Sequence, residues 1–398
     1  MEIDAEKLAK GLVGFGMPDN IARSLVKKVE RGARLCLTEQ EWDWALSHGF
    51  SPDKVAIYGL TDENVEAYLS DFDYYSMHPL NSHFRIWVND KLTLKYILNA
   101  NGLPHAEKNR QSDVMPRYYV HIENDGRYSY LMDMPDDVAR DEDCLQSLLA
   151  HEGILAVKPN RGSGGVGFIR LEAGGDGTVL ANGSAFKSDD FDELKSRLNG
   201  CVVTEYVRQH RELAEIWDGS ECCLRIVMAH LRGRNAFSGG RWVCAASFLR
   251  FGTSRSKSTS NLVQGGVGVG FDFDTGEFFD RGIIYENCGA GGGVELSSHP
   301  DTGIRFEGRK VPLIEQVRDC VLSVCEYLPS LEWLGFDVMV SDDEAKICEI
   351  NTLPGLEGAQ GICGPYLGNG ELRAFFDAKR RPSASNAEFA ELVRACTK

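Results

Sequence analysis

The spacing of hydrophobic residues changes along the chain, from a helical pattern near the start to short strand-like runs after residue 150. Up to about residue 80, Leu8, Leu12, Ile21 and Leu25 recur at spacings that suit one face of a helix. From Ile154 onward, short apolar runs alternate with glycine-rich turns, which is typical of strands. The pattern therefore predicts a helical region followed by a mixed region.

The mixed region combines predicted strands with a few predicted helices. Strands are expected at Ile154–Lys158, Phe168–Leu171, Cys201–Tyr206, Cys222–His230, Arg241–Phe251, Gly335–Val340 and Lys346–Ile350. Helices are expected at Asp90–Asn99, Asp189–Leu198 and Val311–Tyr327. Because many strands are hairpin-like neighbours, the predicted fold class is α+β and not a doubly wound sheet.

Composition and charge narrow the function classes. The chain has 398 residues and a formal net charge of -16, which argues against a nucleic-acid partner because phosphate backbones require a field of Lys and Arg. The twelve cysteines form no C-x-x-C pair, so buried thiols are expected rather than zinc ligands. We recognise no signal peptide and no membrane-spanning apolar run, and we therefore expect a cytoplasmic protein without a membrane partner.

A glycine-rich loop follows the first strand of the mixed region, with G-x-G-x-x-G at Gly162, Gly164 and Gly167. Such glycines let backbone N–H groups approach phosphates, or they simply form a tight turn. A strand follows the loop, unlike in a Rossmann fold, and the motifs of Walker loops and protein kinases are absent. Lys158, at the end of the entering strand, suits a phosphate contact, although alone it would be interpreted as a solvated lysine.

Two acidic residues flank a predicted hairpin near the C-terminus. A turn at Ser341–Glu344 joins two apolar strands, and centring it on Asp343 puts Asp337 opposite Glu349. Asn351 shares a strand face with Glu349 because side chains alternate. Two carboxylates and an amide oxygen are hard ligands that suit Mg²⁺. The alternative is a pair of solvated carboxylates on an edge hairpin.

Together these residues resemble the ATP-grasp superfamily over roughly Phe84 to Gly361. The sequence from Glu349 to Gly355, with Asp337, is similar to the C-terminal signature of D-alanine–D-alanine ligases. Three other segments are more similar to the sugar-transfer-associated (TupA-like) ATP-grasp group: Leu224-Arg225-Ile226, Asn261 to Gly266, and Ser297 to Gly303. This sequence departs from that group at Cys223, where Thr is usual, and at Ser260, where Asp is usual.

The resemblance implies a role for each matching residue. The phosphate-binding residues would be Lys91, Lys158 and the loop Gly162, Ser163, Gly164, Gly165, Val166 and Gly167. The adenine hinge would be Glu205, Tyr206 and Val207, and Glu212 would bind the ribose hydroxyls, with His210 as a competitor. Arg225 and Lys158 would stabilise the transferring phosphoryl group. Asp337, Glu349 and Asn351 would hold magnesium, with two ions expected beside ATP.

The resemblance also implies an ATP-grasp fold, in which two α+β subdomains clamp ATP, with a helical N-terminal extension. We expect the helical region at residues 1–80 and the N-terminal and linker part of the ATP-grasp module at 81–150. The small subdomain with the glycine loop is expected at 151–210, the large subdomain with the magnesium site at 211–371, and a C-terminal tail at 372–398.

The implied activity is a carbon–nitrogen ligase that joins a small-molecule carboxylate to an amine through an acyl phosphate, on a sugar-linked, amino-acid or natural-product substrate. The alternatives are a phosphotransferase with a hydroxyl or amide acceptor and a non-catalytic nucleotide-binding protein. Arg225 supports phosphoryl transfer in general, unless it pairs with a structural acid such as Glu221 or Glu205. Candidate substrate residues are Arg250, Arg255, Lys257, Asn261, Gly265, Gly266 and His299. The basic residues Arg250, Arg255 and Lys257 are explained equally well by a mobile loop with solvated charges. His299 is better interpreted as a turn residue.

Overall fold

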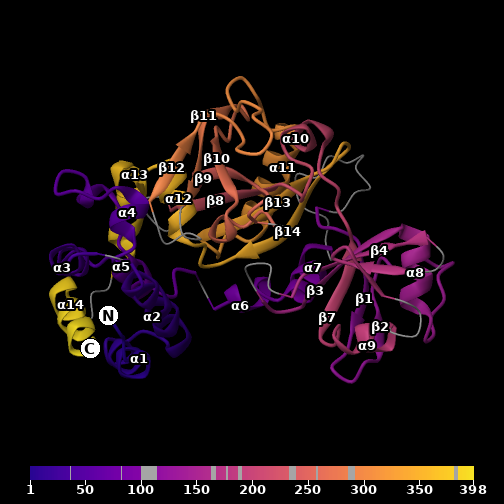
Figure 1. The fold of residues 1–398 in the computed structure, drawn as a ribbon, viewed down its shortest axis with the longest axis horizontal. Coiled ribbons are helices and arrows are strands. Elements are labelled where there is room, and N and C mark those ends of the chain that lie inside the picture. Colours follow the sequence, from indigo (N-terminus) through magenta and orange to yellow (C-terminus); the bar gives the residue numbers. More distant parts are fainter. Residues whose placement is uncertain are drawn as a thin grey trace.

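The computed structural model describes residues 1–35, 37–81, 83–99, 114–162, 167–175, 178–186, 191–232, 239–256, 259–285, 292–380 and 384–398. Three parts lie side by side (Figure 1): a helical region that contains both termini, a central lobe built on one large sheet, and a smaller lobe built on a second sheet. The mixed α+β fold class is confirmed.

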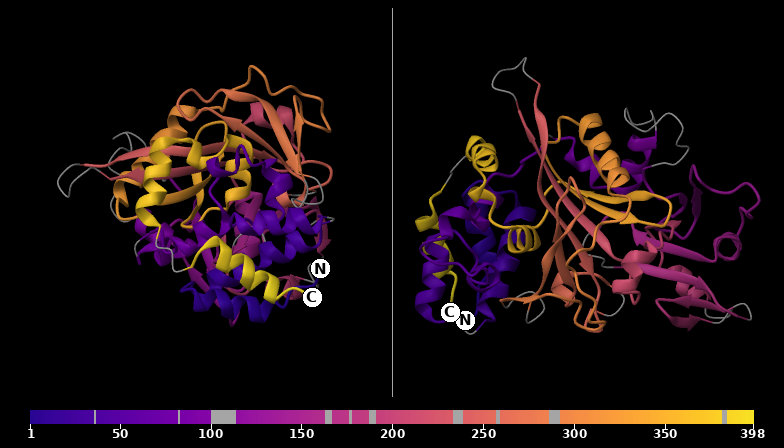
Figure 2. Two further views of the ribbon diagram at one scale, coloured as in Figure 1. Left: turned by 90° about the vertical axis from the view of Figure 1, so that its left-hand side faces the viewer. Right: turned by 90° about the horizontal axis from the view of Figure 1, so that it is seen from above.

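The helical region is assembled from both ends of the chain, which meet in two views (Figures 1 and 2). Its N-terminal helices are α1 (Ala5–Gly14), α2 (Asp19–Ala33), α3 (Glu39–Ser47), α4 (Lys54–Tyr58), η1 (Val65–Ala67) and α5 (Asp71–Ser76). Helices α13 (Gly370–Lys379) and α14 (Asn386–Ala395) join them, and a backbone bridge links Ile3 to Thr397. Residues 372–398 were expected as a tail, but the two helices there are packed, since α13 buries Phe376 and α14 buries Phe389 and Val393 in the helical core.

The smaller lobe is an antiparallel sheet covered by helices on one face. Its strands have the order β2-β1-β7-β3-β4-β5-β6, with bounds β1 (Tyr118–Ile122), β2 (Tyr128–Tyr130), β3 (Ile154–Pro159), β4 (Ile169–Ala173), β5 (Val179–Ala181), β6 (Ser184–Phe186) and β7 (Cys201–Glu205). The covering helices are α8 (Cys144–Glu152) and α9 (Phe191–Ser196). Because β1 and β3 share this sheet, the division expected at residue 150 does not coincide with a boundary between sheets.

The central lobe is the second antiparallel sheet, with the order β12-β11-β10-β9-β8-β13-β14. The strands are β8 (Cys223–Leu231), β9 (Arg241–Phe251), β10 (Val267–Phe271), β11 (Phe278–Tyr285), β12 (Gly293–Leu296), β13 (Trp333–Val340) and β14 (Ala345–Asn351). The remaining elements are α6 (Arg85–Val88), α7 (Lys91–Asn99), α10 (Arg211–Ile216), η4 (Leu262–Gln264), α11 (Ile314–Tyr327), α12 (Leu356–Cys363) and η6 (Tyr366–Gly368). The seven predicted strands match observed strands to within two residues at each end, whereas β1, β2, β5, β6, β10, β11 and β12 were not predicted.

The two faces of the large sheet have different neighbours. Ile226 and Phe336 point to the face that packs against α11 and α7. Val227 and Trp333 point to the opposite face, which packs against α12 and the N-terminal helices. Since side chains alternate along a strand, residues such as Arg225 lie on this second face. Within the described residues, no helix has the length and apolar character needed to cross a membrane.

Asn81 connects the helical region to β13 and to the residue that follows β14. It is 5% exposed, its Nδ2 donates to Trp333 O at 2.8 Å and Thr352 O at 2.9 Å, and its Oδ1 accepts from Trp333 N at 2.9 Å. We predict that Asn81→Ala lowers the free energy of unfolding by about 3 kcal/mol, because it leaves buried backbone groups without partners. Denaturant unfolding measures the effect. Asn199→Ala, which removes an exposed 3.3 Å bond to Asn124 O, is the matched control and should change stability little; equal losses would contradict the prediction.

Candidate nucleotide and metal site

A cavity with about 1350 Å³ of empty space, open to solvent, lies where strands of both sheets meet. Lys158 on β3 and Glu205 on β7 line it from the smaller lobe, while Arg225 on β8 and Asp337 on β13 line it from the large sheet. The cavity occupies the part of the second face of the large sheet that α12 and the N-terminal helices leave uncovered. Residues far apart in the sequence are thus gathered at one place.

The acidic hairpin places its two carboxylates opposite each other through a β-bulge. The strands pair Val340 with Ala345 and Val338 with Ile347, and then the register shifts so that Asp337 pairs with Glu349. The turn is therefore one residue tighter than a turn centred on Asp343, and Cys348 is the extra residue that restores the predicted pair. A bulge re-aims side chains, and Cys348 lines the cavity together with Glu349 and Asn351.

Asp337 is held by two arginines from neighbouring strands. Arg225 Nε donates to Asp337 Oδ1 at 2.6 Å and Arg225 Nη2 donates to Oδ2 at 3.2 Å. Arg250 Nη2 lies 3.1 Å from Asp337 Oδ1 and donates to Cys223 Sγ at 3.0 Å. Burial opposes the charge on Asp337, but the two guanidiniums outweigh it and lower its pKa. The structural partner of Arg225 is thus Asp337, and neither Glu221 nor Glu205.

Glu349 has a different environment from Asp337. Its nearest cation is Lys91, with Nζ 4.0 Å from Oε1. Burial first and the neighbouring Asp337 second raise the pKa of Glu349. A carboxylate that is costly to ionise without a partner favours a cation beside it.

The donor set fits a magnesium ion that is held mainly by phosphates. Asn351 Nδ2 is buried and has no hydrogen-bond partner in the part of the chain that the structure describes, so its amide is free to turn toward a ligand. Within the same residues, no group of three or more His, Cys, Asp or Glu side chains is arranged to hold a metal. Two carboxylates and one amide oxygen are the sparse set that Mg²⁺ uses when a substrate supplies its other oxygens.

Helix α7 brings Lys91 to the glycine loop. Asp90 caps α7 by accepting from Thr93 N at 2.9 Å, and its other oxygen accepts from Asn160 Nδ2 at 3.0 Å and Arg161 Nε at 2.9 Å. Lys91 Nζ donates to Gly162 O at 3.0 Å. The start of the helix and the start of the loop are therefore joined, and Lys91 lines the same cavity as Lys158.

Lys158 faces the cavity without a carboxylate partner among the described residues. Its Nζ lies 5.7 Å from the centre of the Tyr118 ring. Burial first and the nearby Lys91 second lower its pKa. An ammonium in this position gains by binding an anion. Gly167, at the other end of the loop, has φ +80°, and a Cβ there would lie 2.8 Å from Pro159 Cγ, so the turn requires glycine.

The predicted hinge residues Glu205, Tyr206 and Val207 line the other end of the cavity. Glu205 Oε2 is already engaged, since it accepts from Arg117 N and Arg117 Nε, both at 2.9 Å. Apolar side chains lie nearby, and these are Ala156, Phe168 and Met339. Apolar side chains and the hinge residues therefore line the cavity together.

Glu212 and His210, the predicted ribose contacts, do not line the cavity. Glu212 is exposed on the first turn of α10 and lines a separate hollow with Glu215 and Arg309. His210 is the N-cap of α10, and its Nδ1 accepts from Glu212 N at 3.2 Å. Because the ring is used to close the first turn of the helix, both side chains are kept away from the site. Glu221, by contrast, is among the acids that line the cavity, and burial raises its pKa.

The candidate substrate residues separate into two groups. Arg250 and Asn261 line the cavity. Arg255 is exposed, and Gly265, with φ +97°, and Gly266 shape the turn after η4 without lining the cavity. His299 is fully buried, with Nε2 2.8 Å from Gly252 O, and it does not line the cavity. Ser163, Gly164, Gly165, Val166 and Lys257 lie outside the described residues.

Sequence reasoning missed several lining residues, chiefly Glu221, Cys223, Cys348, Thr259 and Ser260. The alternation of β8 was a usable signal for Cys223, since it lies two residues from Arg225 on the same face. Cys348 required knowledge of the bulge. Burial raises its pKa to about 12, so the thiol is neutral.

Comparison with known families decides the identity of the fold. The profile of the sugar-transfer associated ATP-grasp family matches residues 73–369. The chain belongs to this family. The match covers the strands that carry the paired acids and arginines, and it begins within α5, so most of the N-terminal helices of this ATP-grasp protein lie outside it. No curated protein matches the chain.

Solved structures overlap with the ATP-grasp protein only in part. An N5-carboxyaminoimidazole ribonucleotide synthetase in complex with ADP is 11% identical, with a TM-score of 0.35, 72% of this chain covered and 52% of that chain. VanG D-Ala:D-Ser ligase from Enterococcus faecalis is 10% identical, with a TM-score of 0.37 and coverages of 74% and 62%. D-alanine–D-alanine ligase from Bacillus anthracis is 15% identical, with a TM-score of 0.34 and coverages of 77% and 69%. The chain spans about half the length of the first of these structures, and the assignment rests on the family match.

We predict that Glu349→Gln weakens magnesium-dependent binding of a non-hydrolysable ATP analogue by roughly 100-fold, because it removes an anionic ligand. The variant should unfold at the same temperature or higher, since burial disfavours the charge it removes. Calorimetric titration with and without magnesium measures the effect. Glu344→Gln in the turn of the same hairpin is the control, and equal behaviour of the two variants would refute the role of Glu349.

The lowered pKa of Lys158 predicts a pH dependence. As pH rises, a lysine with a depressed pKa loses its proton below the usual value of 10.5, so affinity for the triphosphate should fall by about tenfold between about pH 7 and about pH 10. Lys158→Arg should bind with little change over this range, because a guanidinium stays protonated. Titrations across the pH series test this. Lys379→Arg, on α13, is the control that should retain the wild-type profile; a flat wild-type profile would contradict the prediction.

Proposed function

We propose that the protein is an ATP- and magnesium-dependent ligase that joins a carboxylate to an amine through an acyl phosphate. Family membership supports ATP as the phosphoryl donor, and the charges in the cavity support the rest. The cavity is lined by Lys91, Lys158 and Arg225, which this proposal assigns to the triphosphate, and by Arg250, which it assigns to the acceptor, against the two carboxylates of Asp337 and Glu349. The excess of positive charge suits a polyanion.

In this proposal the triphosphate lies between the two lobes. Lys91 and Lys158 approach it from α7 and β3, next to Gly162, whose backbone also lines the cavity. The base packs against the apolar lining formed by Ala156, Phe168 and Met339, next to the hinge. Glu221 replaces Glu212 as the carboxylate near the ribose.

Asp337, Glu349 and Asn351 would hold the magnesium ions. When bound there, magnesium neutralises phosphate charge and fixes the orientation of the γ-phosphoryl group. The protein itself supplies Arg225 and Lys158, whose donors are suited to stabilise the equatorial oxygens as charge develops.

The observation that carries the choice of acceptor is that two arginines share one carboxylate. If Asp337 also serves a metal ion, it cannot neutralise both guanidiniums, and Arg250 needs another anion. Its buried Nε has no hydrogen-bond partner within the described residues, so a donor remains available. A carboxylate substrate supplies the missing anion, whereas a hydroxyl or amide acceptor does not. Thr259, Ser260 and Asn261 line the cavity on the same side.

The reaction then proceeds in two steps. A carboxylate oxygen attacks the γ-phosphorus, the bond to the β-phosphate oxygen breaks, and ADP leaves. The amine nitrogen attacks the acyl carbon, the C–O bond to phosphate breaks, and the amine loses a proton as the amide forms. The cavity contributes by positioning the reactants and excluding water.

The proposal predicts a trappable acyl phosphate. With ATP, magnesium and pooled carboxylates but no amine, hydroxylamine should yield a hydroxamate, identified by mass spectrometry together with ADP and phosphate. If a phosphorylated alcohol or amide accumulates and no hydroxamate forms, the protein is a phosphotransferase. Arg250→Met should reduce hydroxamate formation by roughly 100-fold and ATP binding far less, because the lost donor faces the acceptor. Arg241→Met, at the exposed start of the same strand, is the matched control and should keep activity.

A further inference from the structure

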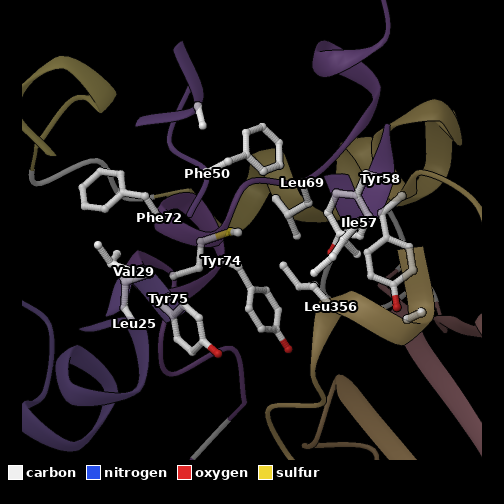
Figure 3. Close-up of a cluster of buried hydrophobic side chains, with 14 of the residues drawn as sticks. Leu25, Val29, Phe50, Ile57, Tyr58, Leu69, Phe72, Tyr74, Tyr75 and Leu356 are labelled. Carbon is white, nitrogen blue, oxygen red and sulfur yellow. The ribbon is translucent and has the colours of Figure 1, made fainter. Parts of the chain in front are cut away.

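The N-terminal helices share one hydrophobic core with the large sheet, although residues 1–72 lie outside the family match. Figure 3 shows side chains of the helical region, among them Tyr74 and Ile57, gathered around Leu356 at the start of α12. Val227 and Trp333 from the sheet belong to the same buried cluster. The helical region therefore packs on the same face of the large sheet as the site, next to it.

A buried network of charges accompanies this core. Glu357, in the first turn of α12, pairs with Lys28 and lies 3.1 Å from Arg31 Nη2 and 3.4 Å from Lys54 Nζ. The same cations contact two acids of the helical region, with 3.0 Å from Lys54 Nζ to Asp53 Oδ1 and 3.5 Å from Lys54 Nζ to Asp71 Oδ1. Three cations thus face three acids.

Glu357 belongs to the large lobe, and all three of its cations belong to the helical region. Burial opposes its charge, but Lys28, Lys54 and Arg31 outweigh that cost and lower its pKa well below the usual range. Buried ion pairs are weak sources of stability, but they define one geometry, because a displaced partner leaves an uncompensated charge. The network therefore fixes the position of α12 relative to α2 and α4.

The segment held in this way connects α12 directly to the site. β14 ends at Asn351, and residues 352–355 form the turn that leads to α12. Tyr74 donates through its hydroxyl to Pro354 O at 2.7 Å, and that hydroxyl accepts from Trp333 Nε1 at 3.0 Å. Pro354 packs against Gly335, where a Cβ would lie 2.6 Å from Pro354 Cβ and 3.6 Å from Arg225 Nη1. A shift of the turn would therefore displace the side chains of Asn351 and Arg225.

We propose that Glu357, with Lys28, Arg31 and Lys54, positions the turn at 352–355 and thereby sets Asn351 and Arg225 for the metal–nucleotide complex. This inference rests on the proposed function, because that function assigns Asn351 and Arg225 to the binding of magnesium and nucleotide. The helical region is then an integral support of the site and not a separately acting module.

The test compares Glu357→Gln with Glu371→Gln. Glu371 lies on α13 and forms an exposed ion pair with Arg241 of β9, so its substitution is the matched control. Glu357→Gln should raise the magnesium concentration needed for half-maximal binding of a non-hydrolysable ATP analogue by roughly tenfold, while metal-free affinity for the analogue changes little. A role limited to stability would lower the melting temperature without moving the magnesium midpoint. Glu357→Asp should recover part of the shift.

Hydrogen exchange separates this inference from the proposed function. Amides of residues 345–356 should exchange faster in Glu357→Gln than in the wild type, whatever the wild-type protein binds. If the wild type binds no magnesium–nucleotide, the proposed function fails, and the exchange result alone decides the positioning role. If Glu357→Gln fails to fold, the same two assays are carried out on Tyr74→Phe. This variant removes only the hydroxyl that donates to Pro354 O, and its result then tests the positioning of the turn. Unchanged exchange and an unchanged magnesium midpoint in a folded variant overturn the inference.

Discussion

The site depends on the compensation of charge at Asp337. A carboxylate on the interior of a sheet is expensive to ionise, and here it is ionised because guanidiniums from β8 and β9 converge on it. The pairing links three neighbouring strands, β9, β8 and β13, and keeps both arginines in the lining of the cavity. Glu349 and Asn351 lie on β14, the strand that pairs with β13, so their positions follow from the same arrangement of strands.

Part of this arrangement was predictable from the sequence, since apolar alternation located β8, β13 and β14 and the polar turn between them. The pairing of Asp337 with Glu349 was predicted by a symmetric turn, whereas the structure reaches it through a tighter turn and a bulge at Cys348. A bulge leaves no local signature in a single sequence. Strands β10 to β12 were missed because glycines interrupt their apolar pattern, as in Val267-Gly268-Val269-Gly270.

The remaining discrepancies concern contacts between distant segments. The resemblance implied Glu212 as the ribose contact, with His210 as a competitor, but both lie outside the cavity, and Glu221, which had no such role assigned, lines it. The partner of Arg225 lies 112 positions away, and that of Lys28 lies 329 positions away. Such pairings follow from tertiary packing, and local propensity does not encode them.

The helical region is completed by α14, which is synthesised more than three hundred residues after α1 and α3. Until it arrives, α1 and α3 lack the partner that covers them, and Lys7 lacks the carbonyl of Ala395, 2.7 Å away in the finished fold. Folding of the first helices during synthesis is therefore provisional, since their apolar side chains stay exposed while more than three hundred residues are still to be made. In heterologous production, the yield of folded protein should therefore depend more on slow translation and added chaperones than on substitutions in the site.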